Sequence, residues 1–518
     1  MKEIPKFLID YLNKRNIKTE EEIRKFLYPK IDDLIDPYII ENIEKATYEI
    51  IKSIENKEGI FIYGDGDIDG IGGVFFILEF LKDKNINLNY YLTHRLEDYE
   101  IEEEFVDYLL KEKYKIIILI DSGISSYKFL KKCEEVNIKA IVIDHHIADF
   151  DILPKSHIYI HPFLISNNID FSAAGLSFKL FQSLISNYPS MHFSDYICIA
   201  GLAVLSENVE LKGDNRIFVK EMVKNLKNSK IKGLNLLTSR YLMDEFEIED
   251  IKIKINPKLN SPGRFGNPDL SLNLLIEKEE EEIEKLLKEI EMLDKKRFQI
   301  TQKIIKDIEK IEGFENRFII FDNFPESLCG IISTRLVEKT NLPFLVMSKK
   351  GDIIKGSGRS PENFNLYEFM KKIKDKFLSF GGHKNAIGFK FRIDKKDEIE
   401  EYWKSIKVFD EKKLVYEYDA IFEIDQIKPD LQEYLNLLKP YGKGNEPPIF
   451  LSRDVLIKKI IKGNEVKYWA KKGNAIFECK VSDTKISEGT KNILYTPIIE
   501  KINNYYRIVL KIDKLIEF

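Results

Sequence analysis

The chain has 518 residues, of which 44% are hydrophobic and 32% charged, with a formal net charge of −5. This length exceeds what one hydrophobic core usually organises, so we expect several domains, and the composition excludes large-scale disorder. The small negative net charge excludes a protein that is basic over its whole surface, so any phosphate binding is expected to be local.

The four cysteines lie far apart in the sequence, which predicts neither a disulfide framework nor a cysteine zinc site. No apolar run approaches the roughly 18 residues that a membrane span needs, and the first residues are charged. We therefore expect a protein of the reducing cytoplasm that makes no membrane contact.

Residues 1–57 are expected to form an N-terminal cap of short amphipathic helices, in which Thr19 and Glu22 have the spacing of a capping box. Residues 58–276 contain the runs GIFIYGDGD, KYKIIILIDSG and IKAIVIDHH, which are β-branched and alternate with helical patterns. Such continuous apolar strands are typical of a parallel sheet covered on both faces. Ligands bind at the carboxyl ends of the strands in these sheets.

Residues 277–312 repeat apolar positions at helical spacing amid dense charge, which predicts one long connecting helix. Residues 313–410 are expected to form a second, smaller α/β domain, with strands at NRFIIFD and LPFLVM and a glycine-rich FGGH. Residues 411–518 alternate apolar and polar residues in short runs, a pattern typical of a small β-barrel. The predicted fold class is therefore α/β with a C-terminal barrel.

Acidic and imidazole residues follow three of the early predicted strands. They are Asp65, Asp67 and Asp69 after the first strand, Asp121 after the second, and Asp144, His145 and His146 after the third. A single aspartate at such a position is most often a helix cap or turn residue. Seven of these residues at neighbouring strand ends would repel one another unless cations neutralised them, so we expect a metal cluster.

Oxygen-rich ligands with a lone imidazole favour Mn²⁺ or Mg²⁺, whereas zinc sites usually carry more nitrogen or sulfur. Two such ions, roughly 3.5–4 Å apart, would lower the pKa of a bridging water and neutralise charge on a phosphate ester. The pattern therefore predicts a two-metal phosphoesterase, with Mn²⁺ as the first choice.

The runs YGDGDIDG, IDSGISS and IDHH resemble motifs one to three of the DHH phosphoesterase superfamily. Five further segments resemble, in the same order, those of the RecJ single-stranded-DNA-specific exonucleases. They are SENVELKGDNR (206–216), PKLNSPGRFGNPDLSLNLL (257–275), GSGRS (356–360), FGGHKNAIGF (380–389) and KPYGKGNEPPIF (439–450). The resemblance implies a DHH catalytic domain, a DHHA1-type substrate-binding domain and an oligonucleotide-binding (OB-like) barrel.

The resemblance also implies roles for the acidic cluster. Asp67, Asp69, Asp121 and His145 would be metal ligands, and Asp65 would complete the acidic first motif. Asp144 would orient His145, and His146 would contact the scissile phosphate or the leaving group. Glu207 aligns where the family has an aspartate that bridges the ions, so we expect it to be a further ligand, at some cost in activity.

Strand-binding residues are implied in the same way. They are Arg95 at the rim of the first domain, Asn260 and Arg264 in a segment like the family's NAAGR loop, Ser357, Arg359, Gly381, Gly382 and His383 in the second domain, and Tyr468 and Trp469 on the barrel. Tight turns are the alternative for the glycine segments, and a solvated lysine-rich face is the alternative for the barrel. The segment NFPESLCGI (323–331) lacks the family's Trp-His, so a DNA contact or an interdomain contact is expected to be missing.

The resemblance implies a 5′ to 3′ exonuclease of DNA recombination and repair. We expect a monomer, with a helicase or a single-strand-binding protein as candidate partner. One alternative is a DHH phosphodiesterase that acts on short oligonucleotides, cyclic dinucleotides or pyrophosphate. The other is a catalytically weakened nucleic-acid-binding scaffold, which Glu207 favours and the retained motif residues disfavour.

Overall fold

The structure is a computed structural model that describes residues 4–94, 100–165, 170–186, 188, 190–309, 317–406, 417–462, 465–481, 487–502 and 505–516. It divides into two compact units. The larger comprises Ile35–Val209 and Phe218–Val408, and the smaller comprises Met1–Leu34, Glu210–Ile217 and Phe409–Phe518. Within the described residues, no helix is both long enough and apolar enough to cross a bilayer.

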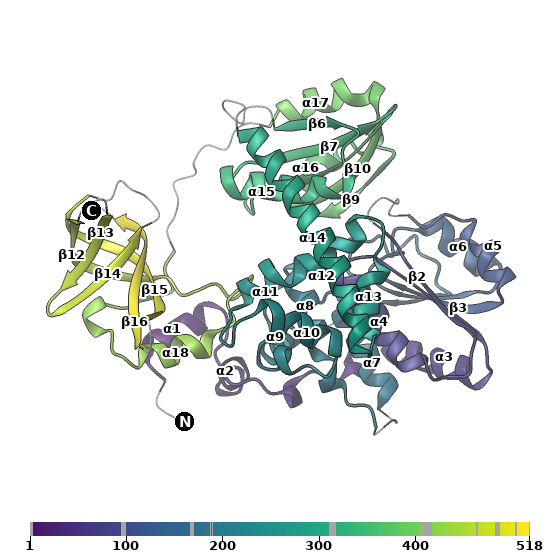
Figure 1. The fold of residues 1–518 in the computed structure, drawn as a ribbon, viewed down its shortest axis with the longest axis horizontal. Coiled ribbons are helices and arrows are strands. Elements are labelled where there is room, and N and C mark those ends of the chain that lie inside the picture. The colour runs from purple at the N-terminus through teal and green to yellow at the C-terminus, as the bar shows by residue number, and fades with distance from the viewer. Residues whose placement is uncertain are drawn as a thin grey trace. The chain divides into compact units, whose positions relative to one another are not determined.

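A five-stranded, wholly parallel sheet organises the first half of the larger unit (Figure 1). Its order is β2 (Leu88–Leu92), β1 (Gly59–Gly64), β3 (Tyr114–Ile120), β4 (Lys139–Ile143) and β5 (Ile158–Ile160). The three apolar runs became the three central strands, β1, β3 and β4, because isoleucine and valine pack well on a pleated surface buried on both sides. This confirms the predicted parallel sheet.

Helices cover both faces of this sheet. They are α3 (Ile43–Glu55), α4 (Ile68–Leu81) and α7 (Ala173–Ile185) on one face, and α5 (Phe105–Lys111) and α6 (Tyr127–Glu135) on the other. Side chains alternate along each strand, so Phe61 and Tyr63 join the core beneath α5 and α6, while Ile120 contacts α4 at Gly73. All six residues of β1 are buried, and so is almost the whole of α4.

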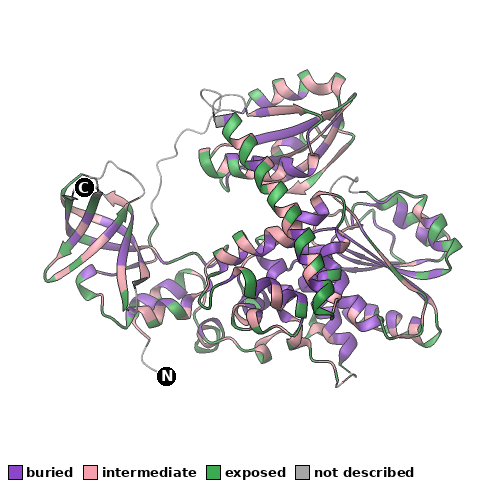
Figure 2. Cartoon of the chain, viewed as in Figure 1, coloured by how far each residue is buried: buried purple, intermediate pink, exposed green. Residues whose placement is uncertain are grey.

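A helical layer follows. Its members are α8 (Ile197–Glu207), α9 (Gly213–Asn225), α10 (Lys232–Tyr241), α11 (Ile248–Lys254), α12 (Asn256–Arg264) and α13 (Asp269–Ile276). The long helix predicted from the charged periodic segment is α14, Glu280–Glu309. Its apolar stripe is buried at Ile283, Leu287 and Ile290, while its other faces are solvated (Figure 2).

A second, mixed sheet follows α14. Its order is β6 (Phe318–Asp322), β7 (Phe344–Lys350), β8 (Ile353–Arg359), β10 (Ala386–Arg392) and β9 (Ser379–His383), and the pair β6 and β7 is parallel. The accompanying helices are α15 (Cys329–Thr340), α16 (Leu366–Lys371) and α17 (Lys396–Lys404). Leu328, Cys329, Ile332 and Leu336 pack on Val346 to form the core beneath α15.

The smaller unit holds a closed barrel (Figure 1). Its strands are β12 (Phe450–Lys462), β13 (Glu465–Lys472), β14 (Ala475–Val481), β16 (Tyr505–Ile516) and β15 (Gly489–Ile502), in that order, and β12 closes the ring by pairing with β15. The other elements are α1 (Lys6–Lys14), α2 (Glu20–Leu27), the short strand β11 (Ala420–Ile421) and α18 (Leu431–Leu438). Thr19 and Glu22 form the predicted capping box at α2.

One buried arginine binds this unit together. Arg216, which is 2% exposed, donates to the backbone carbonyls of Phe26 (2.9 Å), Leu438 (3.0 Å) and Lys439 (3.0 Å) and stacks on the Phe26 ring at 3.9 Å. Burial lowers its pKa to about 10. The guanidinium thereby satisfies carbonyls at the C-terminus of α18, which the helix itself leaves unpaired.

We expect Arg216→Lys to lower the free energy of unfolding by about 3 kcal/mol, because lysine keeps the charge but cannot reach these carbonyls together or stack on Phe26. Denaturant unfolding measures the change. The exposed Arg453→Lys is the matched control, and it should stay within about 0.5 kcal/mol of wild type. Equal stabilities of the two variants would contradict the role of Arg216.

Candidate metal centre

Three aspartates directly after strands lie at one edge of the parallel sheet. The backbone N–H groups of Asp65, Asp121 and Asp144 donate to carbonyls on the neighbouring strand, at 3.2, 2.9 and 3.2 Å respectively. Each aspartate thus continues the ladder of its strand by one residue. The carboxyl ends of parallel strands meet at the same edge, so the three side chains are brought together.

In the described part of the chain, four overlapping groups of potential ligands form there, and two of them include aspartates of the loop 65–69. In the first, which we call the aspartate group, Asp65, Asp67 and Asp121 have carboxylate oxygens within 4.8 Å of one another. The second, which we call the His145 group, combines Asp69, His145 and Glu207 within the same limit. The two groups meet where His145 Nε2 lies 3.3 Å from Asp121 Oδ1.

Backbone amides orient the aspartates of the loop 65–69. Asp67 caps α4 by accepting the N–H of Asp69 at 3.0 Å. Asp69 is fully buried, and its two oxygens accept the N–H groups of Ala173 (2.9 Å) and Ala174 (2.7 Å) at the start of α7. A helix N-terminus stabilises negative charge, so this carboxylate is held in place by α7.

The loop has no room for extra atoms. A Cβ at Gly66 would lie 2.0 Å from the carbonyl oxygen of Thr93, and one at Gly263 would lie 2.0 Å from the carbonyl oxygen of Gly66. Thr93 also donates its hydroxyl to Asp65 at 2.7 Å. Glycine at both positions lets α12 and the segment after β2 approach the loop directly.

The carboxylate of Asp144 makes its side-chain contact with the ring of His146. Its Oδ1 lies 2.7 Å from Nδ1 of His146, whereas it contacts His145 through the backbone N–H, at 2.7 Å. Burial disfavours the charged ring of His146, but the charge and hydrogen bond of Asp144 outweigh burial and raise the pKa of His146 to about 9. Asp144 was expected to orient His145; it holds His145 through the backbone N–H, and the ring that it orients is that of His146.

The electrostatics of the site favour cations. Burial raises the pKa of Asp69 and of Asp121, and the negative charges of Asp69 and Asp67 raise that of Asp121 further. Burial also opposes the charged form of His145, but Asp69 and Glu207 raise its pKa. Among the residues that the structure describes, the buried Asp121 Oδ1 and His145 Nε2 find no hydrogen-bond partner.

Buried polar atoms that face each other without a hydrogen bond are costly, and a cation between carboxylates and an imidazole removes that cost. Five aspartate or glutamate side chains with one imidazole make an oxygen-rich donor set, which suits Mn²⁺ or Mg²⁺ better than zinc. The residues present therefore fit the predicted ions.

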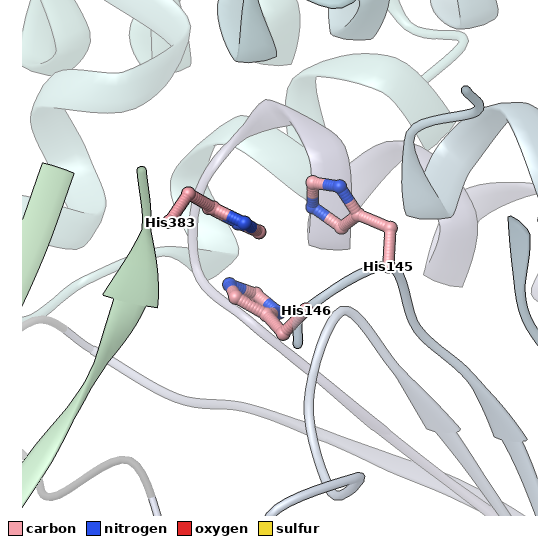
Figure 3. A group of neighbouring side chains, drawn as sticks. All are labelled: His145, His146 and His383. Atoms are coloured by element: carbon pink, nitrogen blue, oxygen red, sulfur yellow. The ribbon is translucent and has the colours of Figure 1, made fainter. Parts of the chain in front are cut away.

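The second sheet contributes a third imidazole. His383, at the end of β9, stacks on His146 with ring centroids 5.1 Å apart and lies 5.5 Å from His145 (Figure 3). Next to it, Gly382 has a φ of 136°, and a Cβ there would lie 2.2 Å from the carbonyl oxygen of Ala386. Gly381 has open space around it.

Arg359 lies on β8 of the same sheet. Its Nη1 donates to Ser357 Oγ (2.7 Å) and to the carbonyl of Gly358 (2.8 Å), which fixes the guanidinium at the strand end. These contacts place Ser357 beside Arg359. Their role in strand binding stays a prediction.

Asn260 and Arg264 make protein contacts instead of facing only solvent. Asn260 accepts the N–H of Ile68 and donates to Ser206 Oγ. Arg264 donates to the carbonyl of Ser327 at 2.8 Å, and Ser327 Oγ donates to the carbonyl of Arg264 at 2.7 Å. The segment 323–331 therefore supplies a contact to the first domain through Ser327, so of the two contacts expected to be missing, to DNA or between domains, the second is present here.

The barrel corrects one prediction. Tyr468 is 7% exposed and packs in the barrel core, so its ring cannot stack on a base, and that prediction is wrong. Trp469 points to the other face of β13 and is half-buried. Tyr505, 81% exposed, and Tyr506, 50% exposed, are aromatic candidates that we missed. Two adjacent tyrosines opening a predicted strand were the available signal. Arg95 lies outside the described residues.

Comparison with known proteins gives three family-model matches. They are the DHH family, N-terminal domain, over residues 59–203, the DHHA1 domain over 316–407, and the RecJ OB domain over 418–514. These ranges cover the parallel sheet, the second sheet and the barrel.

Two curated proteins similar to this chain are single-stranded-DNA-specific exonucleases RecJ. That of Bacillus subtilis (strain 168) is 27% identical over 469 residues, which are 87% of this chain and 59% of the relative. That of Thermus thermophilus is 26% identical over 424 residues, which are 80% of this chain and 61% of the relative. The chain thus spans about three fifths of the length of these relatives.

Among solved structures, RecJ in complex with Mn²⁺ from Thermus thermophilus is similar to this chain, with a TM-score of 0.81 and 20% sequence identity. The match covers 99% of this chain and 76% of that one. At this identity the likeness bears on the fold, and it agrees with the α/β architecture and C-terminal barrel described above.

Proposed function

The chain belongs to the RecJ group of the DHH phosphoesterase superfamily, and on this premise we propose that it is a metal-dependent exonuclease that hydrolyses the phosphodiester bonds of single-stranded DNA. The observation that carries the proposal is the contact between the aspartate group and the His145 group at Asp121 and His145. Degradation from the 5′ end, in recombination and repair, is proposed from family likeness.

In this proposal, Asp65, Asp67 and Asp121 would hold one Mn²⁺ or Mg²⁺ ion, and Asp69, His145 and Glu207 would hold a second. When bound, two such ions activate water and neutralise charge on the attacking and leaving oxygens of a phosphate ester. The protein's part is to fix the carboxylates. Asp67 and Asp69 are held by backbone amides, so their oxygens keep one orientation.

His146 acts on the phosphate. Asp144 engages Nδ1 of its ring, which leaves Nε2 as the nitrogen that faces a phosphate or leaving oxygen. His383, stacked on His146, donates to the adjoining phosphate, and Arg359 and Ser357 bind the next part of the strand. The backbone at Gly381 and Gly382 allows close approach of the phosphate chain.

On the barrel, Trp469 and the exposed Tyr505 and Tyr506 stack on bases, a mode of binding that tolerates any sequence. We further propose that the protein acts as a cytoplasmic monomer, with a helicase or a single-strand-binding protein as partner.

The proposal is tested by incubating the full chain with 5′-labelled and 3′-labelled single strands, duplex and a dinucleotide, with MnCl₂ or with a chelator. We expect hydrolysis of the single strands alone, only with metal, and mononucleotide release from the 5′ end. Preference for the dinucleotide would instead identify an oligonucleotide phosphodiesterase. Strand binding without hydrolysis would instead identify a nucleic-acid-binding scaffold. This is the second candidate function, and it is favoured by Glu207 in place of the family's aspartate.

We expect Glu207→Asp to preserve or raise the rate of hydrolysis, because the family carries aspartate at this position. Glu207 reaches Asp69 and His145 with its longer side chain, and the shorter one restores the family's spacing. Steady-state kinetics at saturating Mn²⁺ measure the effect, with Glu210→Asp, on an exposed side chain, as the matched control. Complete loss of activity in Glu207→Asp alone would show that this site is built for glutamate.

A further inference from the structure

Helix α12 is joined to helix α8 by two side-chain hydrogen bonds that are one helical turn apart. Asn256 donates to the carbonyl of Leu202 at 3.1 Å, and Asn260 donates to Ser206 Oγ at 3.1 Å. Residues four apart share one face of a helix, so a single face of α12 holds a single face of α8. The residue after Ser206 is Glu207, the last residue of α8.

Asn260 also reaches a second element, whereas the described contacts of Asn256 do not. The Oδ1 of Asn260 accepts the N–H of Ile68 at 2.8 Å, and Ile68 lies between Asp67 and Asp69. The close approach of Gly263 to Gly66 seats α12 against the same loop. A carboxamide is the short side chain that offers an acceptor on one atom and donors on the other, so it can join a backbone N–H to a hydroxyl.

We propose that Asn260 is a positioning residue that sets the separation of the aspartate group and the His145 group. Through Ile68 it holds the loop that carries Asp67 and Asp69, and through Ser206 it holds the helix end that carries Glu207. This inference rests on the proposed metal-dependent function. In this inference Asn260 acts through intramolecular hydrogen bonds, whereas the family likeness implied that it contacts nucleic acid.

The consequence for metal binding follows from the geometry. If Asn260 is lost, the hydrogen bonds that link the loop at Ile68 to the end of α8 at Ser206 are lost, so the separation of Asp69 and Glu207 can change although neither residue is altered. Partners that orient metal ligands typically contribute 10- to 100-fold to metal affinity. The effect should appear in binding of the metal alone, without substrate.

The test titrates the full chain with MnCl₂ by calorimetry, for wild type, Asn260→Ala, Ser206→Ala and Asn256→Ala. We expect Asn260→Ala to weaken Mn²⁺ binding by about 10- to 100-fold, and Ser206→Ala, which keeps the bond to Ile68, to weaken it less. Asn256→Ala is the matched control, because it breaks the other bond between α12 and α8 and should leave Mn²⁺ affinity unchanged.

Two further measurements separate positioning from general stability. Thermal melting reports whether each variant is folded, and Asn256→Ala should melt at least as early as Ser206→Ala. Electron paramagnetic resonance of the Mn²⁺-loaded protein reports the coupling between two bound ions, which depends on their separation. We expect that coupling to change in Asn260→Ala and Ser206→Ala and to stay as in wild type in Asn256→Ala.

Wild-type affinity and coupling in Asn260→Ala would overturn the inference while leaving the proposed function intact. An equal loss of Mn²⁺ affinity in Asn256→Ala would also overturn it, because α12 would then act through stability alone. No Mn²⁺ uptake by the wild-type chain would instead overturn the proposed function. If Asn260→Ala does not fold, Ser206→Ala decides the matter by the same readouts.

Discussion

Replacing Asp121 by asparagine is expected to lower the rate of single-strand hydrolysis by roughly 10³-fold or more, while strand affinity stays within about twofold of wild type. Asp121 belongs to the aspartate group and faces His145 of the other group, so its loss affects both candidate ion sites. Several kcal/mol of charge stabilisation in the transition state depend on the ions, and each 1.36 kcal/mol corresponds to about tenfold in rate.

Asparagine is a better test than alanine at this position, because Asp121 has a φ of 55°, in the left-handed region. Asparagine tolerates this conformation, whereas alanine would add strain. Single-turnover kinetics and strand binding in a calcium buffer measure the two quantities. The control is Asp149→Asn, which makes the same charge change on an exposed residue. Wild-type rates in Asp121→Asn would refute its role.

Substituting Gly263 by alanine is expected to lower the free energy of unfolding by about 3 kcal/mol and to weaken Mn²⁺ binding by about 10-fold or more. The added Cβ would lie 2.0 Å from the carbonyl oxygen of Gly66, a contact that backbone movement alone can relieve. The movement would carry α12 away from the loop that holds Asp67 and Asp69.

Denaturant unfolding and calorimetry with MnCl₂ give the two numbers for Gly263→Ala. The matched control is Gly381→Ala, since a Cβ at Gly381 has nothing within 4 Å. That variant should keep its stability and its Mn²⁺ affinity. If Gly263→Ala matched it in both, α12 would not depend on close approach to the loop.

The parts of this fold that the sequence predicted are those in which local pattern and burial agree. The Ile-rich runs of β1, β3 and β4 are buried on both faces, and the aspartates after them had to share one edge once the sheet was parallel. The strand β2 was missed because its residues alternate between half-buried and exposed at the sheet edge, and β5 was missed because it has three residues.

Side-chain partners were harder to predict than elements. Tyr468 and Trp469 are neighbours on one strand, and which of them faces the barrel core depends on a register that a single residue would reverse. Two adjacent histidines follow Asp144 in the sequence, and the backbone conformation after β4 decides which ring contacts its carboxylate. In the structure it is the ring of His146. The bonds of Asn260 join segments about 190 and 54 residues away, which no local pattern encodes.

The hydrogen bonds between Asp69 and the N-terminus of α7 have a consequence for how the site binds a cation. Each carboxylate oxygen already accepts an amide N–H, so the side-chain torsions of Asp69 lose their freedom during folding. Little rotational entropy remains to be lost when an ion arrives, and the carboxylate can bind without first being ordered. A cation would therefore meet a carboxylate, that of Asp69, whose orientation is already fixed by α7, although α7 itself contributes no ligand.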